Sequence, residues 1–148
     1  MTQRYFEDLP VGFCFSTGSR ALTREEVVDF ARDWDPQEFH LDEDAARASH
    51  FGALIASGWQ TLLVAFNLSM AAGIWDEASM GASGMDEVRW FKPVFPGDAI
   101  HVEAEVVTAE RSRSRPDRGR VRIRHDVVNQ HGEKVASYIG NHLIKARA

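Results

Sequence analysis

Hydrophobic residues change their spacing twice along the chain, and each spacing predicts a different kind of element. Between residues 23 and 34 they recur at helical intervals, which predicts an amphipathic helix with one inward face, formed by Val27, Phe30, Ala31 and Trp34. Residues 59–72 are apolar except at four positions, which predicts a buried helix. From Val88 onward the period changes to two, which is the period of β-strands.

Polar and turn residues set the limits of these elements. Thr23 and Glu26 form a capping-box pattern at the start of the first helix, and Pro36 ends it, because proline disfavours helical dihedrals at the preceding residue. Asp42 is a predicted N-cap for a second short helix that ends before Gly52. Residues 10–22 suit a first strand with irregular ends, and the glycine-rich residues 73–87 predict a long loop.

The C-terminal half predicts four strands, over residues 87–95, 99–110, 119–129 and 134–146, most simply joined as antiparallel neighbours in chain order. The whole pattern predicts an α+β fold in which a curved antiparallel β-sheet wraps around one long central helix. A length of 148 residues fits a single domain covering residues 1–148.

Composition and charge narrow the classes of function. A net charge of -5 disfavours nucleic acid as the main partner, since such binding needs a basic surface. No apolar run approaches the roughly 20 residues that span a bilayer, and the start MTQRYFEDLP lacks the features of a signal peptide, so we expect a cytoplasmic protein without membrane contact. The single cysteine, Cys14, lies in an apolar run and is expected to be a small buried hydrophobe. No two histidines stand three or four residues apart, so no metal site is expected.

Seven arginines lie between Arg111 and Arg124. Strict alternation there favours a hairpin with arginine on its outer face and Val121 and Ile123 on its inner face. The alternative is that the arginines contact coenzyme A phosphates or a neighbouring subunit.

The segment DPQEFH contains an acid–histidine pair, Asp35 and His40. Their spacing is too long for one helical face, but a turn after Pro36 can bring both side chains to one shared water, where they can serve as acid and base. Ser57 and Gly58 stand at the start of the buried helix, where free backbone N–H groups and the helix dipole favour developing negative charge. The plain alternative is a solvated acid, a surface histidine and an ordinary N-cap.

Three stretches in order, DPQEFHLDEDAA, GALIASGW and RWFKPVFPGDAIHVEAEV, resemble the MaoC-like dehydratases, which include the (R)-specific enoyl-CoA hydratases and adopt the hotdog fold. Hydratases of this family carry Asp-x-Asn-Pro-x-His with a catalytic aspartate and histidine, which Asp35 and His40 match. Gln37 falls where the family has asparagine, Glu38 falls where it has proline, and the proline here is Pro36.

The resemblance implies a single hotdog domain and a hydratase or dehydratase that adds or removes water syn across an α,β-unsaturated acyl thioester. Asp35 and His40 would be catalytic, and the substrate-binding residues would be Gln37, Ser57, Gly58 and Trp59. It also implies an acyl-CoA substrate, with coenzyme A present only as part of that substrate and no separate cofactor. The resemblance further implies a homodimer in which each active site lies near the subunit boundary. It also implies a role in fatty acid metabolism.

Two other functions stay open. A hotdog thioesterase often carries a carboxylate on the central helix, whereas residues 59–72 contain neither Asp nor Glu. A non-catalytic acyl-thioester binding module is favoured only by the altered Gln37 and Glu38. The apolar residues that follow and end the buried helix could line an acyl tunnel or simply pack as core or lid; they are Met70, Ile74, Trp75, Met80 and Met85.

Overall fold

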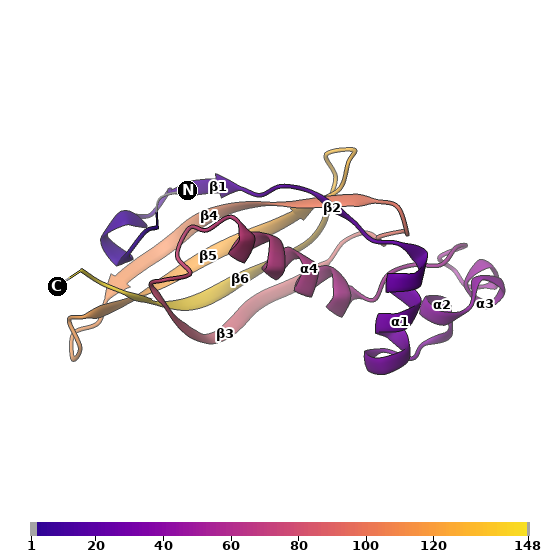
Figure 1. The fold of residues 1–148 in the computed structure, drawn as a ribbon, viewed down its shortest axis with the longest axis horizontal. Helices are drawn as coiled ribbons and strands as arrows, with labels where there is room; N and C mark the ends of the chain where they lie inside the picture. Colours follow the sequence, from indigo (N-terminus) through magenta and orange to yellow (C-terminus); the bar gives the residue numbers. More distant parts are fainter. Residues whose placement is uncertain (1–2, 148) are drawn as a thin grey trace.

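A curved antiparallel sheet wraps around one long helix in the computed structural model, which describes residues 3–147 (Figure 1). The helix is α4 (Gly58–Ala71). The sheet has six strands in the order β1-β4-β5-β6-β3, with β2 also pairing with β4. The strand bounds are β1 Cys14–Ser16, β2 Arg20–Ala21, β3 Ser79–Trp90, β4 Ala99–Arg111, β5 Arg118–Val128 and β6 Lys134–Lys145.

Three of the four long strands, β4, β5 and β6, follow the predicted pattern closely. Side chains alternate between buried and more exposed positions along β4 and β5, because successive residues of a strand point to opposite faces. Val106 pairs with Ile123, and both are fully buried in the same hydrophobic cluster as Leu62 and Ala65 of α4. The predicted arginine hairpin is confirmed, since Val121 and Ile123 are buried while the arginines lie on the other face.

The predicted loop over residues 73–87 is wrong in its second half, which belongs to β3. Nearly every residue of β3 is exposed, so the strand carries no buried–exposed alternation, and glycines and register shifts interrupt its pairing with β6. The expected pairing in chain order is also wrong for this strand, because β3 lies at the edge beside β6 and not beside β4. Residues 91–95, predicted as strand, lie outside β3.

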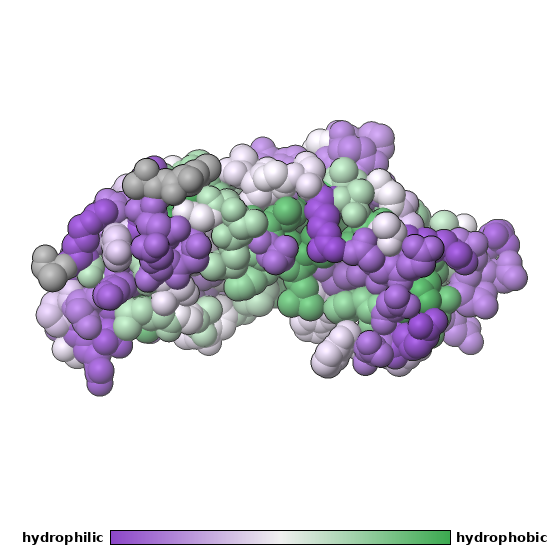
Figure 2. All heavy atoms as spheres, viewed as in Figure 1, coloured by the Kyte–Doolittle hydropathy of each residue, from purple (hydrophilic) through white to green (hydrophobic). Residues whose placement is uncertain are grey.

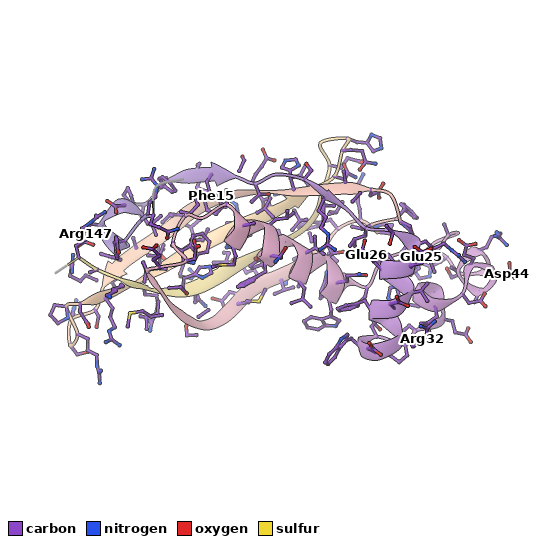
Figure 3. All side chains as sticks on the ribbon, in the orientation of Figure 1. Phe15, Glu25, Glu26, Arg32, Asp44 and Arg147 are labelled. Carbon is purple, nitrogen blue, oxygen red and sulfur yellow. The ribbon has the colours of Figure 1, made fainter. Side chains whose placement is uncertain are left out.

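The N-terminal strand is shorter and more irregular than predicted. Residues 10–22 form a turn followed by the two short strands β1 and β2, after a 3-10 helix η1 (Phe6–Asp8). Phe15 points into the core and packs edge-on against Trp75, with ring centroids 5.6 Å apart (Figure 3). Cys14, next to it on the strand, therefore points outward and is exposed, which corrects the expectation of a buried cysteine.

Three helices precede α4 and form one end of the molecule: α1 (Arg24–Trp34), α2 (Glu38–Leu41) and α3 (Glu43–Ala48). The predicted capping box is present, with the Glu26 N–H donating to Thr23 and the Glu26 carboxylate accepting from the Thr23 N–H. Charged side chains cover the outside of this end, among them Glu25, Glu26, Arg32 and Asp44 (Figure 3).

Trp34 departs from the predicted inward face of α1. Val27 and Ala31 are buried as expected, but Trp34 is 74% exposed. Trp34 ends the helix directly before Asp35, where the chain turns toward α2. The short helix predicted after Asp42 is confirmed as α3, and it begins at the predicted N-cap, because Asp42 accepts from the Ala45 N–H. The preceding helix α2 was not predicted.

The central helix is buried on one side only. Leu62, Val64 and Ala65 face the sheet, while Trp59, Leu63 and Phe66 are 60%, 58% and 46% exposed. The prediction of a helix buried all round is therefore wrong for a single chain. Figure 2 shows apolar side chains gathered over α4 in the middle of the molecule, between two hydrophilic ends. No helix within residues 3–147 is long and apolar enough to cross a membrane.

Candidate active site

Asp35 and His40 meet in space although they lie on different elements. Asp35 is the C-cap residue of α1, and Pro36 prevents the helix from continuing through it. The chain then turns, with the Gln37 N–H donating to the Asp35 carbonyl, so that α2 presents His40 to the carboxylate. His40 Nε2 lies 3.2 Å from Asp35 Oδ2, and the His40 side chain is buried. The predicted turn therefore brings the predicted pair into direct contact.

The other ring nitrogen of His40 fixes how the pair shares its protons. His40 Nδ1 lies 2.7 Å from the carbonyl oxygen of Ile55. A carbonyl can only accept, so we assign the proton to Nδ1, and Nε2 faces the Asp35 carboxylate. Two acceptors at 3.2 Å would repel, so one further proton lies between Nε2 and Oδ2. The pair is thus arranged to hold and pass one proton.

Three side chains donate to Asp35 or lie against it. Ser57 Oγ donates to Oδ2 at 2.6 Å, Gln37 Nε2 donates to Oδ1 at 2.7 Å, and His40 completes the set. Burial opposes ionisation of Asp35 and is the largest single influence on its pKa, but the hydrogen bonds from Ser57 and Gln37 and the positive charge of His40 together outweigh it and lower the pKa. Asp35 is therefore held as a carboxylate.

Ser57 also starts the central helix. It is the N-cap of α4, and its Oγ accepts from the Trp59 N–H at 3.2 Å. The Thr61 N–H donates to the Ser57 carbonyl. Among the described residues, the backbone N–H groups of Gly58 and Gln60 have no partner, as is usual in a first helical turn. Ser57 thus connects the Asp35 carboxylate to the start of α4, where backbone N–H groups are free to donate.

Gly58 is held against an indole. Trp90 Nε1 donates to the Gly58 carbonyl at 2.9 Å, and a Cβ added to Gly58 would lie 2.5 Å from that nitrogen. Only glycine fits there without moving Trp90. Trp90 also packs edge-on against Trp59, with ring centroids 5.7 Å apart.

A cavity of about 410 Å³ opens over the pair and the helix start. Asp35, Gln37 and His40 line it together with Gly58 and Trp59, so five of the six predicted site residues border one cavity, and the sixth, Ser57, touches Asp35 from beneath. Aromatic and basic residues that the sequence did not single out complete its wall, namely Phe39, Phe51, Trp90, Phe91 and Lys92. Trp90 could have been recognised as a candidate from the sequence, because it forms an aromatic pair with Phe91 directly before Lys92. The Ile55 carbonyl that contacts His40 could not, because a backbone group leaves no mark in the sequence.

The arrangement can perform acid–base chemistry on a bound carbonyl compound. A partly buried carboxylate and a buried imidazole share a proton beside the backbone donors of a helix start, which are the parts needed to move protons and to stabilise an oxyanion. Within residues 3–147, no group of three or more His, Cys, Asp or Glu side chains is arranged to hold a metal ion.

The fold and the site together define the class. A long helix wrapped by a curved antiparallel sheet is the hotdog fold, and the predicted acid–histidine pair lies beside the start of that helix. The family model described as MaoC like domain matches residues 14–129. The chain therefore belongs to the MaoC-like domain family.

Individual relatives agree with this assignment. The crystal structure of a MaoC-like dehydratase from Rhodospirillum rubrum is 37% identical, with a TM-score of 0.89 over 98% of this chain and 99% of that one. The YdeM protein of Bacillus subtilis is 31% identical over 73% of this chain and 77% of its own length. The mesaconyl-CoA hydratase of Cereibacter sphaeroides is 34% identical over 57% of this chain, a match that spans 25% of that enzyme.

Proposed function

We propose that this protein is a hydratase, or a dehydratase in the reverse direction, for α,β-unsaturated acyl thioesters, most simply enoyl-CoA esters of (R)-specific stereochemistry. The observation that carries the proposal is the contact of 3.2 Å between His40 Nε2 and Asp35 Oδ2 beside the free N–H groups that begin α4. The relative named as a mesaconyl-CoA hydratase supports a thioester substrate.

In the proposed reaction Asp35 is the base and His40 is the acid. Asp35, held as a carboxylate, takes a proton from a water that lies in the cavity beside both side chains, and the hydroxyl adds to the β-carbon. His40 gives its Nε2 proton to the α-carbon on the same face, which makes the addition syn. Asp35 is then protonated and His40 is neutral, so transfer of the proton across the 3.2 Å contact restores the starting state.

The thioester oxygen, which becomes an enolate oxygen during the reaction, is assigned to the start of α4. The N–H groups of Gly58 and Gln60, which have no partner among residues 3–147, and the positive end of the helix dipole favour negative charge at this point. One such donor contributes about 3 kcal/mol to transition-state stabilisation in comparable sites. Ser57 and Gln37, which hold the carboxylate, act as positioning residues, and Trp59 lines the route to the thioester.

The acyl chain is assigned to a second cavity of about 440 Å³ between α4 and strands β3 and β6. Trp59 borders both cavities, so the two adjoin at the start of α4. The wall is mainly apolar, with Leu62, Phe66 and Met70 from the helix. Coenzyme A enters only as part of the substrate, and the proposed role belongs to fatty acid metabolism in the cytoplasm.

A second copy of the chain is the proposed partner. Within residues 3–147, strand β3 is an edge strand of twelve residues that pairs only with β6, so its outer edge is open to another strand. Beside it lie exposed apolar side chains of α4 and β3, namely Trp59, Leu63, Phe66, Met80 and Met85. Edge-to-edge pairing of β3 strands in a symmetric dimer would cover both features and would bring the active sites close to the subunit boundary.

The proposal is tested by mixing the purified protein with short, medium and branched enoyl-CoA esters. Loss of the conjugated-thioester absorbance is followed beside release of free thiol. We expect Asp35→Asn and His40→Gln each to lower the hydration rate by about 100-fold or more, because each removes one of the two proton-transfer groups. The matched controls, Asp33→Asn and His50→Gln, change exposed residues outside the cavity and should keep the wild-type rate.

Other outcomes point elsewhere. Thiol release without loss of the double bond would show a thioesterase instead. Neither signal, with tight binding of acyl-CoA, would show a binding module. Full activity of either site variant, while circular dichroism shows a folded protein, would contradict the assignment of the pair.

A further inference from the structure

Two histidines and a tyrosine form a polar cluster that the proposed chemistry does not use. His125 lies on β5 opposite Tyr138 of β6, and their rings stack with centroids 4.6 Å apart. His142, two positions beyond Gly140 on the same face of β6, brings its Nε2 within 3.4 Å of His125 Nε2. Tyr138 and His142 line the second cavity, whereas His125 is fully buried behind them.

Within the cluster, His142 lies toward the end of the second cavity that is farther from the catalytic pair. The second cavity extends along α4 from Trp59 to Met70, eleven residues apart, which is roughly 16 Å of helix. Beyond the end of α4, Trp75 packs on His142 with ring centroids 5.1 Å apart. A chain that starts at the catalytic cavity and follows the helix would therefore reach the cluster with its distal part.

Gly140 makes the histidine contact possible. A Cβ added to Gly140 would lie 2.5 Å from His142 Nε2, so the ring leans over the glycine toward His125. The pattern Tyr-x-Gly-x-His in β6 thus places the side chains of Tyr138 and His142 on the same face of the strand, with Gly140 between them. Gly140 itself also lines the cavity.

The hydrogen-bond arrangement leaves donors for a ligand. His125 Nδ1 is buried and has no hydrogen-bond partner among the residues that the structure describes. An unpaired lone pair costs less there than an unpaired N–H, so His125 carries its proton on Nε2 and donates to His142 Nε2. His142 then carries its own proton on Nδ1. Within the described part of the chain, neither His142 Nδ1 nor the Tyr138 hydroxyl has a hydrogen-bond partner.

We infer that this cluster selects acyl chains that carry an uncharged oxygen substituent, such as a hydroxyl or keto group, in their distal part. The inference deepens the proposed function and rests on it for the thioester. The His142 N–H and the Tyr138 hydroxyl would donate to the oxygen, while the apolar wall, including Phe66 and Met70, would bind the carbon chain. A hydrogen-bonding site of this kind discriminates because an unsubstituted chain leaves its donors unpaired.

The oxygen must be uncharged because the cluster has no positive charge to offer. Burial lowers the pKa of His125 to about 3, with a further lowering by His142, and burial lowers the pKa of His142 to about 4. Burial also raises the pKa of the Tyr138 hydroxyl, which stays protonated. No Lys or Arg lines this cavity among the described residues. A carboxylate would therefore be desolvated without a cation to pair with it.

The test compares two saturated acyl-CoA esters of equal length, one unsubstituted and one with a distal hydroxyl group, by isothermal titration calorimetry. Saturated esters cannot be hydrated, so the binding preference is measured apart from catalysis. We expect the wild type to prefer the hydroxylated ester by about 10-fold or more. Tyr138→Phe and His142→Phe should each reduce that preference about five-fold, as expected for one neutral hydrogen bond.

A control variant removes apolar contact in the same cavity without touching the donors. Met70→Ala should weaken binding of both esters alike and leave the preference intact. A wild-type preference below two-fold, a preference for a distal carboxylate, or an unchanged preference in both Phe variants would overturn the inference. If the hydroxyl preference is present but no enoyl ester is hydrated, the proposed reaction fails and the ligand inference stands.

Discussion

The carboxylate of Asp35 shows how single residues define this site. It accepts from Ser57 and Gln37 and lies against His40, so both of its oxygens are occupied on the protein side. Those contacts keep it ionised in spite of burial, and the Ile55 carbonyl keeps the imidazole turned toward it. Gln37, predicted as a substrate-binding residue, contacts the acid directly, so its longer arm relative to asparagine is used to reach Oδ1.

The role of Ser57 can be tested through the pH profile. Ser57→Ala removes a hydrogen bond that lowers the Asp35 pKa, so the pKa rises and the acidic limb of kcat/KM for enoyl-CoA hydration moves to higher pH. We expect kcat to fall about 10-fold, and loss of the N-cap to lower the free energy of unfolding by about 1 kcal/mol. The measurement is the rate of hydration across the acidic range, with urea unfolding beside it.

Ser49→Ala is the matched control for that experiment. Ser49 follows α3, where its Oγ bonds the Ala46 carbonyl and the Phe51 N–H, and it does not touch Asp35. It should lower stability without moving the acidic limb. An equal shift in both variants would show that Ser57 acts only on stability.

At the level of elements, the site depends on where α4 begins. The helix starts at Gly58 because Ser57 caps it, and β3 ends at Trp90, whose indole bonds the first carbonyl of the helix. A helix start and a strand end that lie 32 residues apart are therefore joined by one hydrogen bond over the cavity. This contact fixes the direction of the free N–H groups relative to Asp35.

Gly58→Ala tests this junction. The new Cβ would lie 2.5 Å from Trp90 Nε1, so either the indole or the helix start must move. We expect the free energy of unfolding in urea to fall by about 1–3 kcal/mol, as overpacking usually costs, together with a change in tryptophan fluorescence. Gly18→Ala is the control, because nothing lies within 4 Å of its added Cβ. Equal stability of the two variants would contradict a tight junction.

At the scale of the whole molecule, the sheet and helix are covered on one side only. The exposed edge of β3 and the exposed side of α4 lie together, and the cavity over Asp35 and His40 borders them through Trp59 and Trp90. The hydrophilic residues gather at the two ends instead (Figure 2). These features are the basis for the proposed dimer.

Leu63→Glu tests that dimer. Leu63 lies on the exposed side of α4, and a buried carboxylate without a partner would oppose association. We expect sedimentation equilibrium to show a dimer for the wild type and a monomer for the variant. Val11→Glu changes a 64% exposed apolar residue near the N-terminus and should remain dimeric. A monomeric wild type, or a dimeric Leu63→Glu, would contradict the proposed interface.

The sequence by itself was enough to predict the elements whose residues follow a regular local pattern. The alternating strands β4, β5 and β6, the capping box of α1, the N-cap Ser57 and the pair Asp35 and His40 could all be recognised, because each depends on residues close together in the chain. The resemblance placed the pair in a family that the comparisons confirm.

Contacts between distant segments were decided only by the tertiary structure. Strand β3 has no alternating pattern because neither of its faces is buried within one chain, so the sequence predicted a loop. Trp34 and Cys14 fit apolar patterns but point outward, because the fold offers them no surface to cover. Ser57 meets Asp35 across 22 residues, and His142 meets His125 only because β5 and β6 pair in one register and Gly140 leaves room for the ring.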